Sequence, residues 1–301
     1  MCGIHYSIAV NEEIEFIFDR NRPTMEIRTL ADVPLNKITN AFNEAFADYK
    51  IRFNLTEDAM ATKIKSENIQ LQYSPAAFDG EQLAGFILTA TDIINNEKVV
   101  YNAGTGVLPA YRGRAIAKHL YQFLLPFLKQ QGYYRHQLEV FDDNDKAIAT
   151  YVSSGFKEKR KMVCYKGRFA PSDKQGNKVK EILIDEELFQ SFWNIKPSWQ
   201  NDLPSIKRNL GEHRVIGIED EGRVIAYAIY AFKTGRVKQC AVKHDKRRMG
   251  LGKSLFDYIA RHIEVTEVTV TCLEHEAGID SFLEKIGLYS FIEMTEMELS
   301  V

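Results

Sequence analysis

The chain has 301 residues, of which 45% are hydrophobic and 27% are charged, and its formal net charge is −2. This length and balance are typical of a globular protein with two domains, and the near-neutral net charge gives no support to a general nucleic-acid-binding or polyanion-binding role. No apolar run approaches the roughly 18–20 residues of a membrane-spanning helix, so we expect neither a nucleic-acid nor a membrane partner.

The first part of the chain, residues 1–24, is expected to form an N-terminal extension. Apolar residues alternate over 6–10 and 14–18, which predicts two short strands. The start, Met-Cys-Gly-Ile, is similar to that of class II glutamine amidotransferases, whose nucleophile is an N-terminal cysteine. A different domain starts near residue 25, and this favours an extension instead. Acidic residues between positions 12 and 19 do not fit a signal peptide, so we expect a cytoplasmic protein.

Residues 25–166 are predicted to form one α/β domain. Strand 25–30 is followed by two helices, over 35–49 and 57–68, the second capped by Thr56. A hairpin over 75–94 turns at Asp79–Gly80. The remaining elements of this half are a strand over 97–108, a helix over 116–131, a strand over 134–141, a helix over 144–154 and a strand over 156–167.

Residues 167–177 are polar and rich in Gly, Pro and Lys, which predicts a linker. The same order of elements then restarts and fills residues 178–301. Two landmarks recur at nearly one offset. Arg247 lies 135 positions after Arg112, and Gly287 lies 132 positions after Gly155. A duplicated α/β domain explains this repetition.

The four cysteines, at positions 2, 164, 240 and 272, are not spaced as metal ligands or redox pairs. We expect buried or unlinked thiols in a reducing compartment. Cys272 and His275 form a single Cys-x-x-His, and without a second pair this does not predict zinc. The sequence therefore predicts no metal site.

The stretch GVLPAYRGRAIAKHL, residues 106–120, joins an apolar strand to a helix through a turn of small residues. A helix N-terminus presents unpaired backbone N–H groups and the positive end of the helix dipole, which together bind phosphate oxygens. A pyrophosphate can approach only where side chains are small, as in R-x-x-A-x-A from Arg112 and R-x-x-G-x-G from Arg247. The arginines add positive charge. Neither the Rossmann G-x-G-x-x-G nor the P-loop pattern is present.

Residues 107–117 resemble the [QR]-x-x-G-x-[GA] fingerprint of the Gcn5-related N-acetyltransferase (GNAT) superfamily, with Ala115 in place of the usual glycine. Residues 138–156, LEVFDDNDKAIATYVSSGF, resemble its second conserved block. The resemblance covers about 25–166 and 178–301. It implies a mixed α/β (α+β) fold of two tandem GNAT domains, each a mixed, mostly antiparallel sheet flanked by helices. It also implies acetyl-CoA as cosubstrate and no metal.

The resemblance assigns a set of acetyl-CoA contacts in each domain. In the first domain these are Val107, Arg112, Gly113, Arg114, Ala115, Ile116, Ala117 and Asn144. In the second domain they are Val242, Arg247, Gly250 and Gly252. Alanine at a helix start is expected to be unstrained, so that Ala115 preserves binding.

The expected chemistry is direct attack of a neutral amine on the thioester. Backbone N–H groups of the central strand stabilise the oxyanion. Tyr151 stands at the general-acid position of the second block and is the predicted catalytic residue, which protonates the departing thiolate. The general base stays open. The strand offers only Asn102 and Thr105, so a water chain or a carboxylate such as Glu139 is the alternative.

The second copy departs from the pattern. Leu283 takes the place of Tyr151 before the closing glycine and cannot donate a proton, and Glu276 stands near the place of Asn144. We therefore predict an N-acetyltransferase that moves an acetyl group from acetyl-CoA to a primary amine, with catalysis in the N-terminal domain. The acceptor is a small-molecule or protein amine. The alternative is a non-catalytic acyl-CoA-binding or regulatory tandem GNAT module, and the sequence leaves the oligomeric state open.

Overall fold

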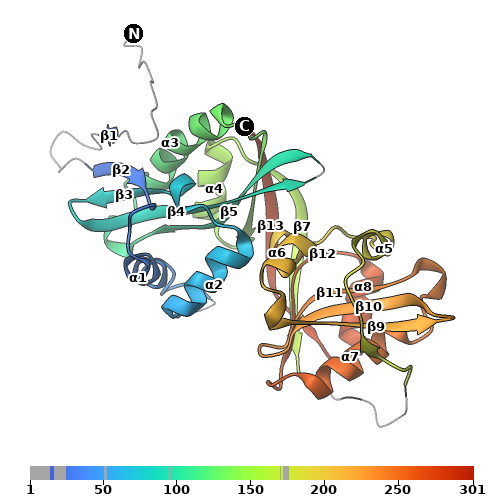
Figure 1. Ribbon diagram of the computed structural model, residues 1–301. Helices are drawn as coiled ribbons and strands as arrows, with labels where there is room; N and C mark the ends of the chain where they lie inside the picture. Colours follow the sequence, from blue (N-terminus) through green and yellow to red (C-terminus); the bar gives the residue numbers. More distant parts are fainter. Residues whose placement is uncertain (1–13, 17–24, 51–52, 95, 170, 172–175) are drawn as a thin grey trace. The chain divides into compact units, whose positions relative to one another are not determined.

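The computed structural model describes residues 14–16, 25–50, 53–94, 96–169, 171 and 176–301 (Figure 1). Most of the expected N-terminal extension, with Cys2, therefore lies outside the described residues, as does part of the expected linker. The chain divides into two compact units. Unit 1 comprises Met1–Val140, Asn144–Glu158 and Met297–Val301, and unit 2 comprises Phe141–Asp143 and Lys159–Glu296.

Unit 1 is a mostly antiparallel sheet with helices on both faces (Figure 1). Its strands lie in the order β1 (Ile14–Phe16), β2 (Met25–Thr29), β3 (Pro75–Asp79), β4 (Gln82–Ile94), β5 (Glu97–Val107) and β6 (Arg135–Phe141), followed by the end of β13 (Tyr289–Ser300). Its helices are α1 (Leu35–Ala45), α2 (Glu57–Glu67), α3 (Ile116–Gln130) and α4 (Asp145–Ser153), with the 3-10 turns η1 (Leu71–Tyr73) and η2 (Pro109–Tyr111).

The core of unit 1 follows from the spacing of its apolar residues. Helix α3 buries Ile116, Leu120, Leu124 and Leu128, which are four positions apart and so form one stripe against the sheet. Helix α1 packs on β4 and β5 from the opposite face, and Phe42 stacks near Phe86 with ring centroids 6.1 Å apart. Strand β4 is buried on both sides because helices cover both faces of the sheet.

Unit 2 repeats the arrangement. Its strands lie in the order β13 (here residues 289–296), β7 (Lys157–Gly167), β12 (Val268–Glu274), β11 (Arg236–Val242), β10 (Arg223–Ala231), β9 (His213–Asp220) and β8 (Lys180–Glu181). Its helices are α5 (Glu186–Ser191), α6 (Leu203–Arg208), α7 (Leu251–His262) and α8 (Ala277–Lys285), with the 3-10 turns η3 (Trp199–Asn201), η4 (Leu210–Glu212) and η5 (His244–Lys246). The predicted mixed α/β fold, with a mostly antiparallel sheet in each half, is confirmed.

Each unit contains a strand segment from the other half of the sequence. Strand β7 follows the elements of unit 1, but its residues 162–167 pair antiparallel with β12 in unit 2. Conversely, the last residues of the chain belong to unit 1, where the Val301 N–H donates to the Tyr134 carbonyl at 3.0 Å and Met297 is fully buried. Unit 2 also includes Phe141–Asp143, so each compact unit is assembled from more than one stretch of the sequence.

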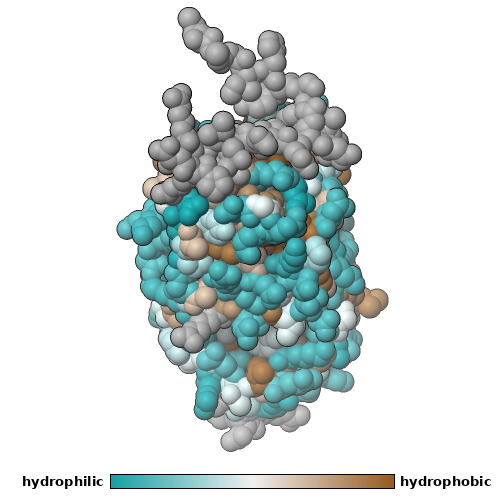
Figure 2. Space-filling view, turned by 90° about the vertical axis from the view of Figure 1, so that its left-hand side faces the viewer, coloured by the Kyte–Doolittle hydropathy of each residue, from teal (hydrophilic) through white to brown (hydrophobic). Residues whose placement is uncertain are grey.

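The surface and the helices of the described residues were compared with what a membrane-spanning protein requires. Hydrophilic side chains dominate that face in Figure 2, and hydrophobic residues appear there as small separate areas. None of the helices in the described ranges combines the length and the apolar character that crossing a bilayer requires.

Candidate functional site

A parallel strand pair separates along its length in each unit. In unit 1, β5 pairs with β6 from Val99 to Tyr101, and the described residues show no pairing between these strands beyond that point. In unit 2, β11 pairs with β12 only at Arg236 and Val237 in the same sense. Because β5 runs on to residue 107 and β11 to residue 242, the carboxyl ends of both strand pairs splay apart.

Both splayed strands carry an irregularity at the same place. The β4–β5 register shifts next to Thr89, where Ala103 is left out of the pairing, and the β10–β11 register shifts next to Tyr230, where Lys238 is left out. Residues 103 and 238 are 135 positions apart, as are the two arginines of the repeated turn. A bulge leaves an unpaired residue and turns the strand, so both copies expose backbone groups at the splayed end.

In each unit the splayed strand is followed by a turn with the same backbone conformation, and this turn leads into a helix. In unit 1, Gly113 (φ +77°) and Ala115 (φ +55°) adopt the left-handed conformation, and α3 begins at residue 116. In unit 2, Arg248 (φ +64°) and Gly250 (φ +80°) do the same directly before α7. The two turns therefore share one geometry although their glycines stand at different positions.

The expectation that Ala115 is unstrained is wrong. A left-handed φ brings Cβ close to the following carbonyl oxygen and costs a non-glycine residue roughly 1–2 kcal/mol. Unit 2 meets the same requirement with Gly250, and the strained residue of its turn is Arg248. A Cβ at Gly250 would meet no atom within 4 Å, so the position faces open space rather than a packed neighbour.

The helix starts present the backbone donors that the sequence predicted. The first intrahelical bond of the α3 start runs from the His119 N–H to the Ala115 carbonyl at 3.1 Å. In α7 the matching bond runs from the Ser254 N–H to the Gly250 carbonyl at 3.0 Å. The preceding N–H groups, including those of Ile116 and Ala117, have no intrahelical acceptor, as at any helix N-terminus. The buried Ile116 side chain leaves only its backbone to face a ligand.

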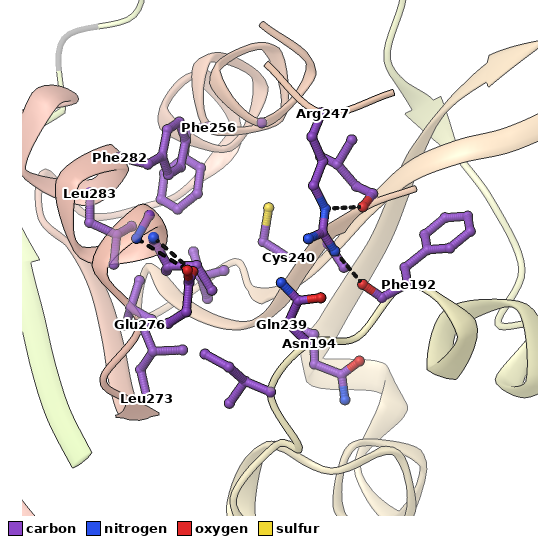
Figure 3. Close-up of a pocket in the computed structure, with 18 of the residues that line it drawn as sticks. Phe192, Asn194, Gln239, Cys240, Arg247, Phe256, Leu273, Glu276, Phe282 and Leu283 are labelled. Carbon is purple, nitrogen blue, oxygen red and sulfur yellow. Dashed lines mark hydrogen bonds between the residues drawn. The ribbon is translucent and has the colours of Figure 1, made fainter. Parts of the chain in front are cut away.

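The two turn arginines bind protein carbonyls. Arg112 Nε donates to the Val107 carbonyl at 3.2 Å, and its Nη2 donates to the Ala45 carbonyl at the end of α1 at 3.0 Å. Arg247 repeats this pattern with the Val242 carbonyl at 3.0 Å and the Phe192 carbonyl at 2.9 Å (Figure 3). Both guanidinium groups thus fasten the turn to the strand before it and to the first helix of the unit.

Arg112 also makes an ion pair that Arg247 does not repeat among the described contacts. Its guanidinium contacts both carboxylate oxygens of Asp48, at 2.5 and 2.9 Å, and this pairing lowers the pKa of Asp48. Arg114 lies over the Tyr111 ring, 5.0 Å from its centroid, and donates to the Ala110 carbonyl at 3.2 Å. No sequence pattern pointed to Asp48, which lies 64 positions before its partner.

Asn144 and Glu276 occupy matching helix caps. The Asn144 side chain accepts a hydrogen bond from the Ala147 N–H at 3.2 Å and donates to the Tyr49 hydroxyl at 3.2 Å. The Glu276 carboxylate accepts from the N–H groups of Gly278 and Ile279 at 3.2 and 3.0 Å (Figure 3). Asparagine and glutamate therefore both satisfy backbone donors at the helix start.

Tyr151 lies in an aromatic cluster of unit 1. Its ring is 6.0 Å from Tyr121 and 5.8 Å from Phe156, both in edge-on geometry. The Tyr121 hydroxyl accepts a hydrogen bond from Asn102 at 2.7 Å, and Asn102 also donates to Thr105 at 2.7 Å. Burial raises the pKa of Tyr151 to about 12. The phenol is therefore protonated at neutral pH, and Tyr121 is a member of this cluster that the sequence did not reveal.

Glu139, the carboxylate considered as a base, accepts a hydrogen bond from the Tyr101 hydroxyl at 2.7 Å. It alternates along β6 with His136, Leu138 and Val140, which are buried. Since Leu138 and Val140 belong to the same core as Tyr151, Glu139 points to the opposite side of the sheet.

Unit 2 contains a cavity of about 570 Å³ at the splayed end of β11 and β12. Figure 3 shows Phe256, Phe282, Leu283 and Leu273 on one side of it and Gln239 and Asn194 on another. Gly252 also lines the cavity, and a Cβ there would lie 3.2 Å from the Phe282 ring, so packing requires a small residue. Leu283 is buried among apolar neighbours and offers no proton.

Comparison with known proteins agrees with this geometry. The sequence model of the acetyltransferase (GNAT) family matches residues 36–156 and again residues 179–287. No curated protein matches the chain.

Three similar solved structures share the fold. One is the GCN5-related glucosamine N-acetyltransferase region of a fungal multi-domain GH3 β-N-acetylglucosaminidase, with 17% identity, a TM-score of 0.71 and 93% of this chain covered. The chain spans 38% of the length of that protein. A GCN5-related N-acetyltransferase from Sphaerobacter thermophilus has 13% identity and a TM-score of 0.69, with 92% and 95% of the two chains covered. A tandem GNAT protein from the clavulanic acid biosynthesis pathway has 11% identity and a TM-score of 0.67, with 92% and 98% covered.

Two family matches cover most of the chain, and the neighbours with both halves in place include a tandem protein. The matched ranges contain both left-handed turns and both splayed strand pairs. The chain therefore belongs to the acetyltransferase (GNAT) family as a tandem, two-domain member.

Proposed function

We propose that this protein transfers an acetyl group from acetyl-CoA to a primary amine, and that unit 1 carries out the reaction. The supporting observation is the turn at 112–115, which leads from the splayed strand β5 into the exposed N–H groups of the α3 start. A pyrophosphate at that place is stabilised by the N–H groups and by the helix dipole. The use of acetyl-CoA by the GNAT family supports the choice of donor.

In this proposal the turn residues divide their roles. Gly113, Ala115 and the N–H groups of Ile116 and Ala117 contact the pyrophosphate. Arg112 holds the turn in place through the Val107 and Ala45 carbonyls, so its contribution is to position the donors. Arg114 and Asn144 remain candidate contacts to the rest of the cosubstrate. Arg247 and the Val242 carbonyl take the positioning part in unit 2, where Gly250 and Gly252 stand at the helix start.

The proposed chemistry begins with attack of the neutral amine nitrogen on the thioester carbonyl carbon. The carbonyl oxygen becomes an oxyanion, for which the bulged end of β5 offers backbone donors. The carbon–sulfur bond then breaks, and the thiolate takes a proton. Tyr151 supplies that proton, since a pKa of about 12 keeps the phenol protonated at neutral and mildly alkaline pH.

A panel of small amines and of peptides with a free N-terminus or lysine tests the proposal. Purified protein is mixed with acetyl-CoA and each acceptor, free CoA thiol is measured, and the product is weighed by mass spectrometry. The proposal expects thiol release that depends on an acceptor and a product heavier by one acetyl group. Acceptor-independent release, or none with any amine, contradicts it.

A second candidate is a non-catalytic acyl-CoA-binding module, and the cavity of unit 2 favours it. That cavity opens beside the turn at Arg247 and contains Leu283 where unit 1 has Tyr151. Such a module binds acetyl-CoA without releasing thiol, so calorimetry and the thiol assay together distinguish the two functions.

A further inference from the structure

Three sulfur atoms meet in unit 2, where β12 pairs with β7. The sulfur cluster consists of Cys164 on β7, Cys272 on β12 and Met294 on β13. Met294 Sδ lies 4.0 Å from Cys164 Sγ and 3.8 Å from Cys272 Sγ. The two cysteines are 4% and 8% exposed, while Met294 is partly exposed, so the cluster is shielded but reachable from one side.

The backbone of β12 is distorted at Cys272, which carries one of the two thiols. Cys272 has φ +53°, a left-handed conformation inside a strand. The β7–β12 register shifts there, so that Thr271 and Cys272 together stand opposite Cys164. A non-glycine residue in this region is strained, and such strain concentrates at functional positions. The distortion brings the Cys272 thiol to the same side of the sheet as Cys164 and Met294.

We propose that the sulfur cluster binds one copper(I) ion. Thiolate and thioether sulfurs are soft ligands, which copper(I) prefers and which zinc and iron–sulfur clusters also take. Metal–thiolate bonds of about 2.3 Å, the length known for zinc, separate three sulfurs in a trigonal plane by about 4.0 Å. The two separations that involve Met294 Sδ, 3.8 and 4.0 Å, are close to that spacing.

Zinc fits the cluster poorly. A structural zinc ion takes four nitrogen, oxygen or thiolate ligands, and the described residues contain no group of three or more His, Cys, Asp or Glu side chains placed to hold a metal. His275, three positions after Cys272, turns to Asp280, with its Nδ1 3.3 Å from the carboxylate. The donors at hand are therefore two thiols and one thioether.

Binding converts both thiols to thiolates and releases two protons to solvent, while the metal stays copper(I). The Cys272 N–H, 3.3 Å from Cys164 Sγ, donates to that sulfur and stabilises its charged form. Lys166 Nζ lies 4.8 Å from the centroid of the Phe291 ring, which packs against the cluster, and its charge opposes the net negative charge of the site.

The test uses the full chain with the other two thiols removed, as the variant C2S/C240S. Reduced, metal-free protein is titrated with copper(I) under anaerobic conditions against a chromogenic copper(I) chelator. The proposal expects one equivalent to be withheld from the chelator and X-ray absorption to show three sulfur neighbours at about 2.3 Å. In the same background C164S and C272S lose this copper, and M294L, which keeps both thiols and the apolar volume, weakens affinity at least about tenfold.

Circular dichroism of each variant shows whether it is folded. If a cysteine variant does not fold, the copper affinity of M294L tests the proposal instead. Copper uptake that M294L leaves unchanged, or no uptake by C2S/C240S, overturns the proposal. Recovery of Cys164 and Cys272 as a disulfide from anaerobically prepared protein also overturns it. Each of these outcomes is independent of acetyl transfer.

Discussion

Ala115 and Gly250 occupy the same left-handed position before a helix and differ by one methyl group. We predict that Ala115→Gly raises the free energy of unfolding by about 0.5–1 kcal/mol, because relief of strain exceeds the added freedom of the unfolded chain. Gly250→Ala is expected to lower it by about 1 kcal/mol. Denaturant titration measures both. Ala117→Gly is the control, since residue 117 is helical and the same change there is expected to destabilise the protein. Equal changes in the free energy of unfolding at positions 115 and 117 would contradict the claim that Ala115 is strained.

Tyr151 is the residue on which the proposed chemistry depends most. Tyr151→Phe is expected to lower turnover by roughly 10²–10⁴-fold, the size of general-acid effects, with little change in the Kd for acetyl-CoA. Tyr121→Phe removes a hydroxyl from the same aromatic cluster and is the matched control, with a smaller expected loss. Turnover at the native rate in Tyr151→Phe would show that Tyr151 packs in the core and is not the general acid.

His136 makes stability depend on pH. It is fully buried, neither ring nitrogen has a hydrogen-bond partner among the described residues, and burial lowers its pKa to about 3. Below its usual pKa of about 6.5 the unfolded chain gains a proton that the folded chain does not, so stability present above pH 6.5 is lost toward pH 3. The contribution of this residue reaches about 1.4 kcal/mol per pH unit.

We predict that His136→Leu flattens the decline in the free energy of unfolding between pH 6.5 and pH 4. Denaturant titrations at a series of pH values measure it. His119, which is partly exposed, serves for comparison, and His119→Leu is expected to change the slope less. Parallel pH profiles for the native chain and His136→Leu would show that the histidine is not held neutral.

At the residue scale the sequence predicted a turn directly before each of the helices α3 and α7 and showed the contrast between Tyr151 and Leu283. It did not predict the strain at Ala115, because φ depends on how the chain leaves the 3-10 turn before it. Nor did it predict that Arg112 binds the Ala45 carbonyl and Asp48, because those partners lie on a helix and loop brought close only by folding.

At the scale of elements, the exchanged strand segments have a measurable consequence. Met297 is fully buried in the core of unit 1, near the far end of the chain. Met297→Ala is expected to lower the free energy of unfolding by about 2–5 kcal/mol, the usual cost of emptying a buried methionine site. Ser300→Ala, at an exposed position of the same strand, is the control.

The unfolding of the Met297→Ala variant is followed by hydrogen exchange as well as by denaturant. Faster hydrogen exchange is expected in β6, because β6 is the neighbour of β13 in the sheet. Unchanged exchange in β6 would mean that residues 297–301 contribute little to unit 1.

Order and type of elements could be predicted largely from the sequence, because apolar residues recur at strand and helix spacing throughout. Strand partners could not. Residues 156–167 read as a strand that ends the first domain, yet most of β7 pairs with β12 in unit 2, since the pattern of one strand does not name the strand it pairs with. Helix α5 is short, Glu186–Ser191, and the chain after it lines the cavity.

For the whole molecule, the proposal assigns different work to two units of one fold. Unit 1 has a protonated phenol near the splayed strand and a strained alanine at its turn. Unit 2 has an open cavity, a glycine at the same position of its turn and no proton donor at Leu283. We therefore expect acetyl transfer to depend on the turn of unit 1, and unit 2 to support the protein without that chemistry.

A negative side chain placed at each turn tests this division. Glutamate at a helix start repels a pyrophosphate and occupies its space. Ala115 already adopts a left-handed φ with a side chain, so Ala115→Glu adds charge with little new strain. Ala115→Gln, with the same size and no charge, is its control, and Gly250→Ala measures the strain that any residue other than glycine adds in unit 2.

The rate of acceptor-dependent CoA release by Ala115→Glu and by Gly250→Glu, measured side by side with the native protein, addresses the central claim most directly. The account predicts that Ala115→Glu eliminates turnover and that Gly250→Glu keeps most of it. Turnover lost in Gly250→Glu and retained in Ala115→Glu, with both proteins folded, would place the active site in unit 2 and contradict the account.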